Sequence, residues 1–231
     1  LSARHWRFYA VVLVAIVGVV GALRGGVARP TSIAVMLVAL VVAFRAVLSA
    51  RFRHGWEPLE GWSWVGGLAV ATLIGALSLE ALARLRPGPG FPIAAWAQLA
   101  LLGGALHFGK TTSDAQLAGV VAAALGAFVV ISSFSRERAW VAGAGGVLAF
   151  LWATLVVEGR EFAYLPSLSA ALLAVAPFAL WSADAPIFAG LGSKGRAAAR
   201  VILAVMPPAA ALVLAWLEAN ASASSNPYGN L

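Results

Sequence analysis

Residues 8–23 read FYAVVLVAIVGVVGAL, an apolar run without a charged side chain. Comparable runs recur along the chain, separated by short clusters of Arg, Glu, Pro and Gly. A hydrocarbon core of roughly 30 Å requires about 20 helical residues. Each run is therefore long enough, or nearly long enough, to cross a bilayer as a helix.

The composition supports this interpretation for the whole chain. Of 231 residues, 61% are hydrophobic and 11% are charged, with a mean hydropathy of +0.90. A soluble domain of this length cannot bury so much apolar surface. The runs are also continuous, whereas barrel strands alternate between lipid-facing and lumen-facing residues. We therefore expect an all-α fold, a polytopic transmembrane helix bundle.

We expect eight spans, with seven as the alternative. The basic N-terminal segment favours a cytoplasmic start and the tail without Lys or Arg favours export, which together require an odd number of spans. Counted over the whole eight-span arrangement, Lys and Arg fall almost equally on the two sides, seven against nine, and do not fix the orientation. The eight predicted spans are Phe8–Leu23, Thr31–Leu48, Trp62–Ala83, Phe91–Phe108, Ala115–Phe134, Trp140–Val157, Leu165–Trp181 and Val201–Leu217.

The expected domain organisation is a single transmembrane domain over residues 1–219 and a polar tail over residues 220–231. The tail is rich in Ser and Asn, and we expect it to be extended. No small-x-small cleavage site ends the first apolar run, so we expect it to be a retained helix. The expected location is a bacterial-type inner or plasma membrane.

The net charge of +7 belongs to loops that meet anionic lipid head groups. We therefore expect membrane lipids and other membrane protein subunits as partners, and no nucleic acid. The chain contains no cysteine, which excludes disulfides, thiolate metal sites and cysteine nucleophiles. No metal site is expected.

Charged residues avoid the middle of every predicted span. Arg45, Glu80, Glu158 and Arg200 all lie within about two turns of a span end, where side chains can reach the interface. Proton pumps and ion-coupled carriers usually place charges deeper. This pattern favours interfacial anchors over an ion pathway.

His107 is the candidate cofactor ligand, because it ends the fourth span one turn after Gly103 and Gly104. A small residue before a histidine leaves room for a flat macrocycle, so a pigment at His107 is one hypothesis. The alternative is an interfacial or packing histidine. With Lys110 and Asp114, His107 also forms a possible interfacial enzyme site, although no catalytic motif is present and no catalytic residue is assigned. We expect Asp114 to cap the fifth span.

Gln98 is the most deeply placed strongly polar side chain and the candidate substrate-binding residue. The alternative is a helix–helix hydrogen bond, which is the more frequent use of such groups in membranes.

Small residues at helical spacing predict close helix packing. They form three ridges: Gly67, Ala71 and Gly75; Ala122 and Gly126; and Ala142 and Gly146. Pro177 and the pair Pro207 and Pro208 are expected to kink the last two spans, because proline removes a backbone donor.

A faint internal repeat relates the third and sixth spans. Trp62, Gly67, Leu73, Leu77 and Glu80 recur as Trp140, Gly145, Leu151, Leu155 and Glu158. Such a repeat would be inverted, as in many transporters. The alternative is coincidence in a chain of few residue types.

These observations lead to three functional hypotheses. The first is a non-catalytic polytopic subunit that packs within a larger membrane protein assembly. The second is a small-solute or lipid carrier. The third is an interfacial membrane enzyme or pigment-binding subunit that uses His107.

Overall fold

Helices make up 92% of the described residues in the computed structural model, and no strand occurs among them. The structure describes residues 3–23, 30–85, 90–134, 144–188 and 190–224. In lipid, a helix satisfies its backbone hydrogen bonds within one segment, so continuous apolar runs fold this way. The predicted all-α helical bundle is confirmed.

Residue contacts divide the chain into two compact units. Unit 1 comprises Leu1–Leu85 and Trp140–Thr154, and unit 2 comprises Arg86–Ala139 and Leu155–Leu231. The boundary falls inside one helix, so that helix contributes residues to both units. The expectation of a single domain over residues 1–219 stays a prediction.

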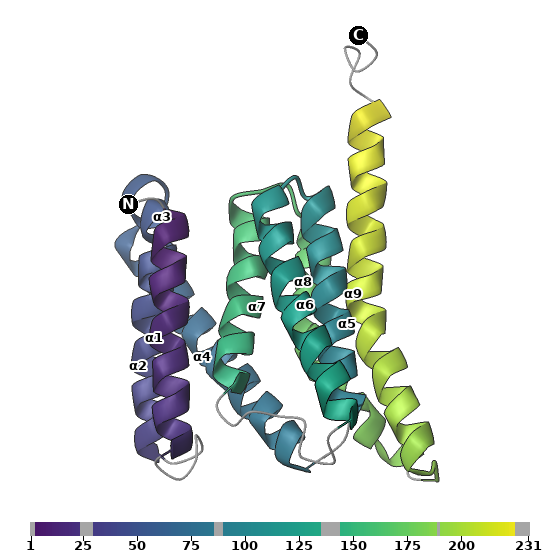
Figure 1. Cartoon of the computed structure of the whole chain (residues 1–231). Coiled ribbons are helices and arrows are strands. Elements are labelled where there is room, and N and C mark those ends of the chain that lie inside the picture. The colour runs from purple at the N-terminus through teal and green to yellow at the C-terminus, as the bar shows by residue number, and fades with distance from the viewer. Residues whose placement is uncertain (1–2, 24–29, 86–89, 135–143, 189, 225–231) are drawn as a thin grey trace. The chain divides into compact units, whose positions relative to one another are not determined.

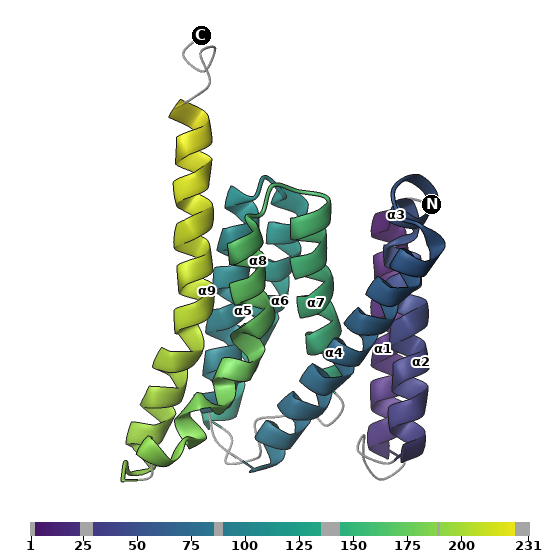
Figure 2. The ribbon, with the colours of Figure 1, turned by 180° about the vertical axis from the view of Figure 1, so that it is seen from behind.

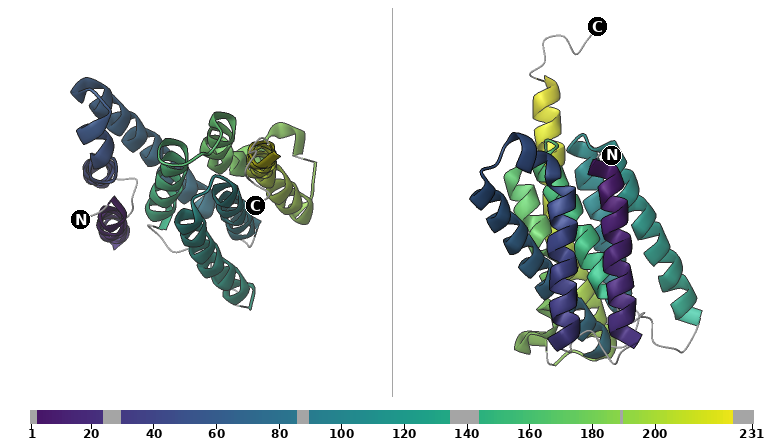
Figure 3. Two further views of the ribbon diagram at one scale, coloured as in Figure 1. Left: turned by 90° about the horizontal axis from the view of Figure 1, so that it is seen from above. Right: turned by 90° about the vertical axis from the view of Figure 1, so that its left-hand side faces the viewer.

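Unit 1 contains a pair of neighbouring helices, α1 (Ala3–Leu23) and α2 (Pro30–Val47). They lie side by side (Figure 3). The short helix α3 (Ser49–His54) follows α2 and leads into α4 (Pro58–Leu85), which packs against α2. The first half of α7 (Ala144–Glu161) completes the unit. Its Phe150 ring meets the Phe44 ring of α2 edge to face, with centroids 5.2 Å apart.

Unit 2 is built on α5 (Gly90–Phe108), which packs against both α6 (Thr112–Phe134) and α9 (Ser193–Ser224). The helix α8 (Ser167–Val175) passes directly into the 3₁₀ helix η1 (Ala176–Asp184), as Figure 2 shows. A second 3₁₀ turn, η2 (Pro186–Phe188), precedes α9. Both α8 and η1 pack against α9.

Within the described residues, seven helices are long and apolar enough to cross a membrane. The chain is therefore a multi-pass membrane protein. Seven of the eight predicted spans have such a helix. The exception is Trp140–Val157, whose first residues lie outside the described part. Its helix, α7, carries Glu158, Arg160 and Glu161 at its end. With three charges in 18 residues, α7 is too polar to count among the seven helices that could cross a membrane.

Proline marks several helix boundaries. Pro30 and Pro58 are the first residues of α2 and α4, where the missing N–H would have no partner in the helix. Pro177 lies at the start of η1, where α-helical winding changes to 3₁₀ winding. Pro207 and Pro208 lie inside α9, and the helix bends about midway along its length (Figure 1). The expected disturbance of the last two spans is thus present.

The C-terminal region differs from the expected extended tail. Helix α9 continues to Ser224, so residues 220–224 are helical, and residues 225–231 lie outside the described part. Alanine favours helix in this segment, and the Ser222 hydroxyl donates to the Glu218 carbonyl at 2.9 Å. This bond to the preceding turn is one that a helix accommodates.

Candidate functional site

A pocket of about 580 Å³ opens at one end of unit 1. It lies between the start of α1, the end of α2, α3 and the start of α4. The pocket has apolar walls and two arginines. Its lining residues are Trp6, Val41, Val42, Arg45, Ala46, Ser49, Arg53 and Trp62.

Arg45 is held over aromatic rings at this pocket. Its guanidinium carbon lies 3.9 Å from the Phe52 ring centroid and 5.9 Å from that of Trp62. The two rings meet edge to face at 5.8 Å. Beside them, Trp56 and Trp64 stack at 5.9 Å with planes 6° apart. Cation–π attraction therefore positions the Arg45 charge without neutralising it.

Arg53 supplies the second charge of the pocket. Its side chain is exposed, and Nε donates to the Ser49 carbonyl of the preceding turn at 3.4 Å. Within the described residues, neither Arg45 nor Arg53 forms an ion pair with a carboxylate. The pocket thus offers two cationic groups beside apolar walls, which suits a ligand with an anionic group and an apolar part.

Local sequence explains how these side chains come together. Leu48 is fully buried at the turn that joins α2 to α3. This turn brings Arg45 of α2 and Arg53 of α3 to the same end of the unit. Gly61 allows the Phe52 ring to approach α4, because a Cβ there would lie only 2.5 Å from the ring carbon Cε1. Sequence reasoning did not identify this pocket. The available signal was two arginines eight residues apart and an adjacent cluster of tryptophans.

Gln98 has a clear role in the packing of unit 2. Its side chain is 2% exposed, and its Nε2 donates to the carbonyls of Ala176, at 2.6 Å, and Ala204, at 2.9 Å. Ala204 lies four residues before Pro208, whose missing N–H leaves that carbonyl without its helical donor. Gln98 therefore joins α5 to η1 and α9 at the positions where prolines disturb the winding. Substrate binding by Gln98 stays a prediction.

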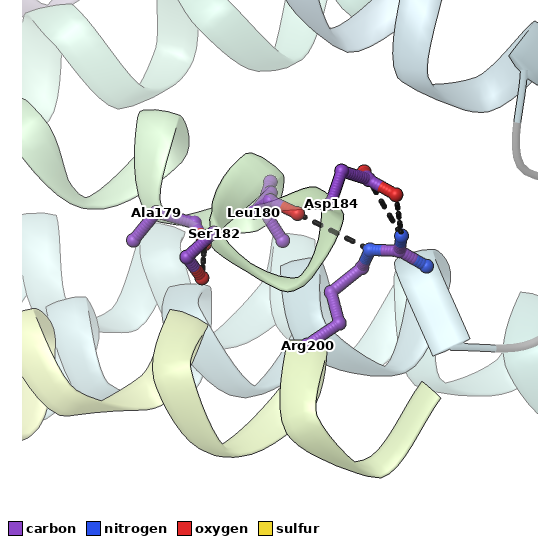
Figure 4. A network of polar contacts seen from close by, with 5 residues as sticks. All are labelled: Ala179, Leu180, Ser182, Asp184 and Arg200. Atoms are coloured by element: carbon purple, nitrogen blue, oxygen red, sulfur yellow. Dashed lines mark hydrogen bonds and ion pairs between the residues drawn. The ribbon is translucent and has the colours of Figure 1, made fainter. Parts of the chain in front are cut away.

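Arg200 of α9 forms a second polar connection in unit 2. Its Nη2 donates to both carboxylate oxygens of Asp184 at 3.1 Å, and its Nε donates to the Leu180 carbonyl at 3.2 Å. Figure 4 shows the guanidinium directed at both partners in η1. The side chains of Arg200 and Asp184 are 8% and 14% exposed. This is a largely buried, charge-assisted pair.

The expectation that Glu80, Glu158 and Arg200 reach outward to the interface is wrong, because all three residues are buried. Glu80 is 4% exposed, and its Oε1 accepts the Gly145 N–H of α7 at 3.0 Å. Arg200 is buried and bound to Asp184. Glu80 and Arg200 instead join two helices each, since Glu80 binds α7 and Arg200 binds η1. The position of each residue within its own span does not reveal these partners.

His107 is exposed at the end of α5, and its ring contacts that of Phe108 at 5.6 Å. The glycines before it are covered by protein. A Cβ at Gly103 would lie 3.4 Å from the Ala118 methyl of α6, and one at Gly104 would lie 3.0 Å from the Leu212 side chain of α9. These glycines serve helix packing, and a pigment at His107 stays a prediction.

The other members of the possible interfacial enzyme site, Lys110 and Asp114, lie at the turn after α5 and at the start of α6. Lys110 adopts a left-handed conformation with φ 62°, and its ammonium lies 5.3 Å from the Tyr164 ring centroid. Asp114 is buried inside the first turn of α6, which begins at Thr112, so Asp114 is not the cap that we expected. No group of three or more His, Asp or Glu side chains suited to a metal occurs among the described residues.

Several predicted packing residues lie against other helices. A Cβ at Gly75 would lie 3.7 Å from Ala149 of α7, and one at Gly126 would lie 3.1 Å from the Trp96 indole nitrogen of α5. Gly146 lies against Met36 of α2, and Ala122 is 5% exposed.

Other small residues are exposed in the part of the chain that the structure describes. Gly67 and Ala71 of α4 are exposed, and nothing lies within 4 Å of a Cβ built at Gly67. Gly119 and Ala123 of α6 are also exposed, with open space at Gly119. Ala142 lies outside the described residues, as does Trp140 of the possible repeat, which stays a prediction.

Comparison with known proteins gives no relative: no family model, curated protein or solved structure matches this chain.

Proposed function

We propose that this chain is a non-catalytic membrane subunit that packs against other membrane proteins in a larger assembly. The observation that carries the proposal is the exposed face of α4 formed by Gly67 and Ala71, named here the α4 face. Small residues four positions apart let a second helix backbone approach closely. In contrast, contact with lipid alone places no such demand on residue size.

The same helix shows how such residues are used. One turn further along α4, Gly75 packs against Ala149 of α7. Gly67 and Ala71 continue that ridge and are exposed among the described residues of unit 1. A partner helix at the α4 face would extend an arrangement that α4 already uses within unit 1.

The test is a double variant, Gly67→Leu with Ala71→Leu, purified from native membranes in mild detergent. We expect the wild-type chain to co-purify with other membrane proteins and the double variant to lose them. Val70→Leu is the matched control, because Val70 is exposed on the same helix but is already large, and it should retain the partners. The proposal fails if the wild-type chain is a homogeneous monomer without partners, or if the double variant retains them.

A small-solute or lipid carrier is the second candidate. It is favoured by the break between α8 and η1 and by the prolines inside α9, which Gln98 bridges. Broken helices form substrate sites in many transporters. Proteoliposomes that contain the chain should then show a solute or lipid flux that Gln98→Leu abolishes, and the absence of any flux from wild-type protein counts against this candidate.

A further inference from the structure

We propose that the pocket at the end of unit 1 binds the headgroup of an anionic phospholipid. This site is separate from the α4 face and does not depend on the proposed assembly. The inference rests on three properties of the pocket: its cationic groups, its apolar walls and its place at the end of membrane-spanning helices.

The cationic groups are available to an external anion. Arg45 contacts the faces of Phe52 and Trp62, and Arg53 contacts a backbone carbonyl of its own helix. Within the described residues, no carboxylate neutralises either guanidinium. The planar guanidinium presents several N–H donors in a geometry that matches the oxygens of a phosphate group. Two such groups at one pocket therefore favour a phosphate ligand.

The walls distinguish a lipid from a free phosphate. Val41, Val42 and Ala46 line the pocket along α2, and a hydrated inorganic phosphate would gain nothing from these side chains. Trp6 and Trp62 complete the lining and are 38% and 51% exposed, as is typical of tryptophans in the head-group layer. A ligand that contacts both parts has a phosphate and a hydrocarbon portion.

The location and size of the pocket agree with this ligand. The helices that form it, α1, α2 and α4, are each long and apolar enough to span a membrane, and the pocket lies at their ends. Its volume of about 580 Å³ falls in the range of small-molecule sites, roughly 300–1,000 Å³. It can hold a headgroup, with the acyl chains leaving along the exposed Val42 side of α2.

The test measures lipid binding to the purified full chain in uncharged detergent by native mass spectrometry. The probes are dihexanoyl phosphatidylglycerol, dihexanoyl phosphatidylcholine and inorganic phosphate. We expect the anionic lipid to bind at least about tenfold more tightly than the zwitterionic lipid, since each interfacial arginine contributes roughly a fivefold gain. Inorganic phosphate should bind more weakly than the anionic lipid and displace it only in large excess.

Variants then assign the preference to the pocket. Arg53→Gln should lower the affinity for phosphatidylglycerol roughly fivefold, and Arg45→Gln combined with Arg53→Gln should remove most of the preference over phosphatidylcholine. Arg84→Gln is the matched control, because Arg84 is exposed in the last turn of α4 and does not line the pocket. It should leave both affinities unchanged. If the double variant does not fold, the exposed Arg53 position decides alone.

Four results would overturn the proposal. These are equal binding of the two lipids by the wild-type chain, an unchanged preference in Arg53→Gln, an equal loss in Arg84→Gln, and binding of inorganic phosphate as tight as that of the anionic lipid. The third result would indicate general surface attraction, and the fourth a site for free phosphate.

Discussion

Arg45 and Arg200 each lie near one end of an apolar helix, yet their side chains have opposite surroundings. The Arg45 guanidinium lies over two aromatic rings beside an open pocket in unit 1. The Arg200 guanidinium is buried in unit 2 and binds both oxygens of Asp184 and the carbonyl of Leu180. An arginine near the end of an apolar helix can thus stabilise the fold in one unit and remain available to a ligand in the other.

The difference extends to the neighbourhoods of the two arginines. Elsewhere in unit 2, the unit of Arg200, polar side chains also hydrogen-bond to backbone carbonyls: Gln98 to Ala176 and Ala204, and Ser169 to Ala211 at 3.0 Å. Around Arg45, rings contact rings. Directed bonds in a medium of low dielectric fix a geometry, whereas aromatic contacts position a charge and leave its hydrogen-bond donors open. The free energy of unfolding should therefore fall more when a buried polar side chain of unit 2 is replaced than when Arg45 is replaced.

The largest expected effect follows from Asp184→Leu. The substitution leaves the buried Arg200 guanidinium without its carboxylate, so the free energy of unfolding should fall by about 3 kcal/mol. Unfolding in mixed micelles of detergent and sodium dodecyl sulfate measures it. Adding Arg200→Leu should restore more than half of the loss, because the uncompensated charge is removed. A double variant no more stable than Asp184→Leu would show that the pair does not account for the loss.

Gln98→Leu should lower the free energy of unfolding by about 2 kcal/mol in the same assay, because two buried carbonyls lose their donor. Gln116→Leu is the control: Gln116 is exposed on α6, and its replacement should change stability by less than about 0.5 kcal/mol. If the two variants are equally stable, Gln98 does not stabilise the junction of α5, η1 and α9.

Gly145→Ala tests the contact between α4 and α7 in unit 1. The new Cβ would lie 2.9 Å from the Ala76 carbonyl oxygen and from Glu80 Cγ, so the helices must separate at a cost of about 1.5 kcal/mol. Gly66→Ala should instead raise stability by roughly 0.5–1 kcal/mol, since nothing lies within 4 Å of its Cβ and alanine favours helix. A stabilising Gly145→Ala would contradict the packing described for this contact.

The smallest effect is expected for Arg45→Leu. A cation–π contact at an accessible site contributes about 0.5–1 kcal/mol, and the change breaks no ion pair among the described residues. The loss of unfolding free energy should therefore be well below that of Asp184→Leu. A loss as large as 3 kcal/mol would remove the contrast between the two arginines.

The fold class could be predicted from the sequence because lipid imposes a simple rule: each continuous apolar run must form a helix that satisfies its own backbone. The run at residues 8–23 already contains this information. Proline positions likewise predicted the disturbed winding at Pro177 and in α9. These features depend on residues within one segment.

The polar contacts could not be predicted in the same way, because they depend on which helices meet. Gln98 lies 78 and 106 residues from the two carbonyls that it binds, and Glu80 lies 65 residues from Gly145. Position within a span suggested that Glu80 and Arg200 reach the interface, and tertiary packing buried them instead. The pocket was missed for the same reason, because Trp6 joins Arg45 and Trp62 only in three dimensions.

The length of α9 has a consequence for membrane thickness. With 32 residues and a rise of 1.5 Å per residue, the helix is about 48 Å long, well beyond a hydrocarbon core of roughly 30 Å. A straight helix of this length must tilt strongly or extend into the head groups. The proline pair gives α9 another response, because a change in the bend at Pro207 and Pro208 alters its reach along the bilayer normal. The C-terminal helix can thereby adapt to bilayers of different thickness while Gln98 and Arg200 hold its first half in place.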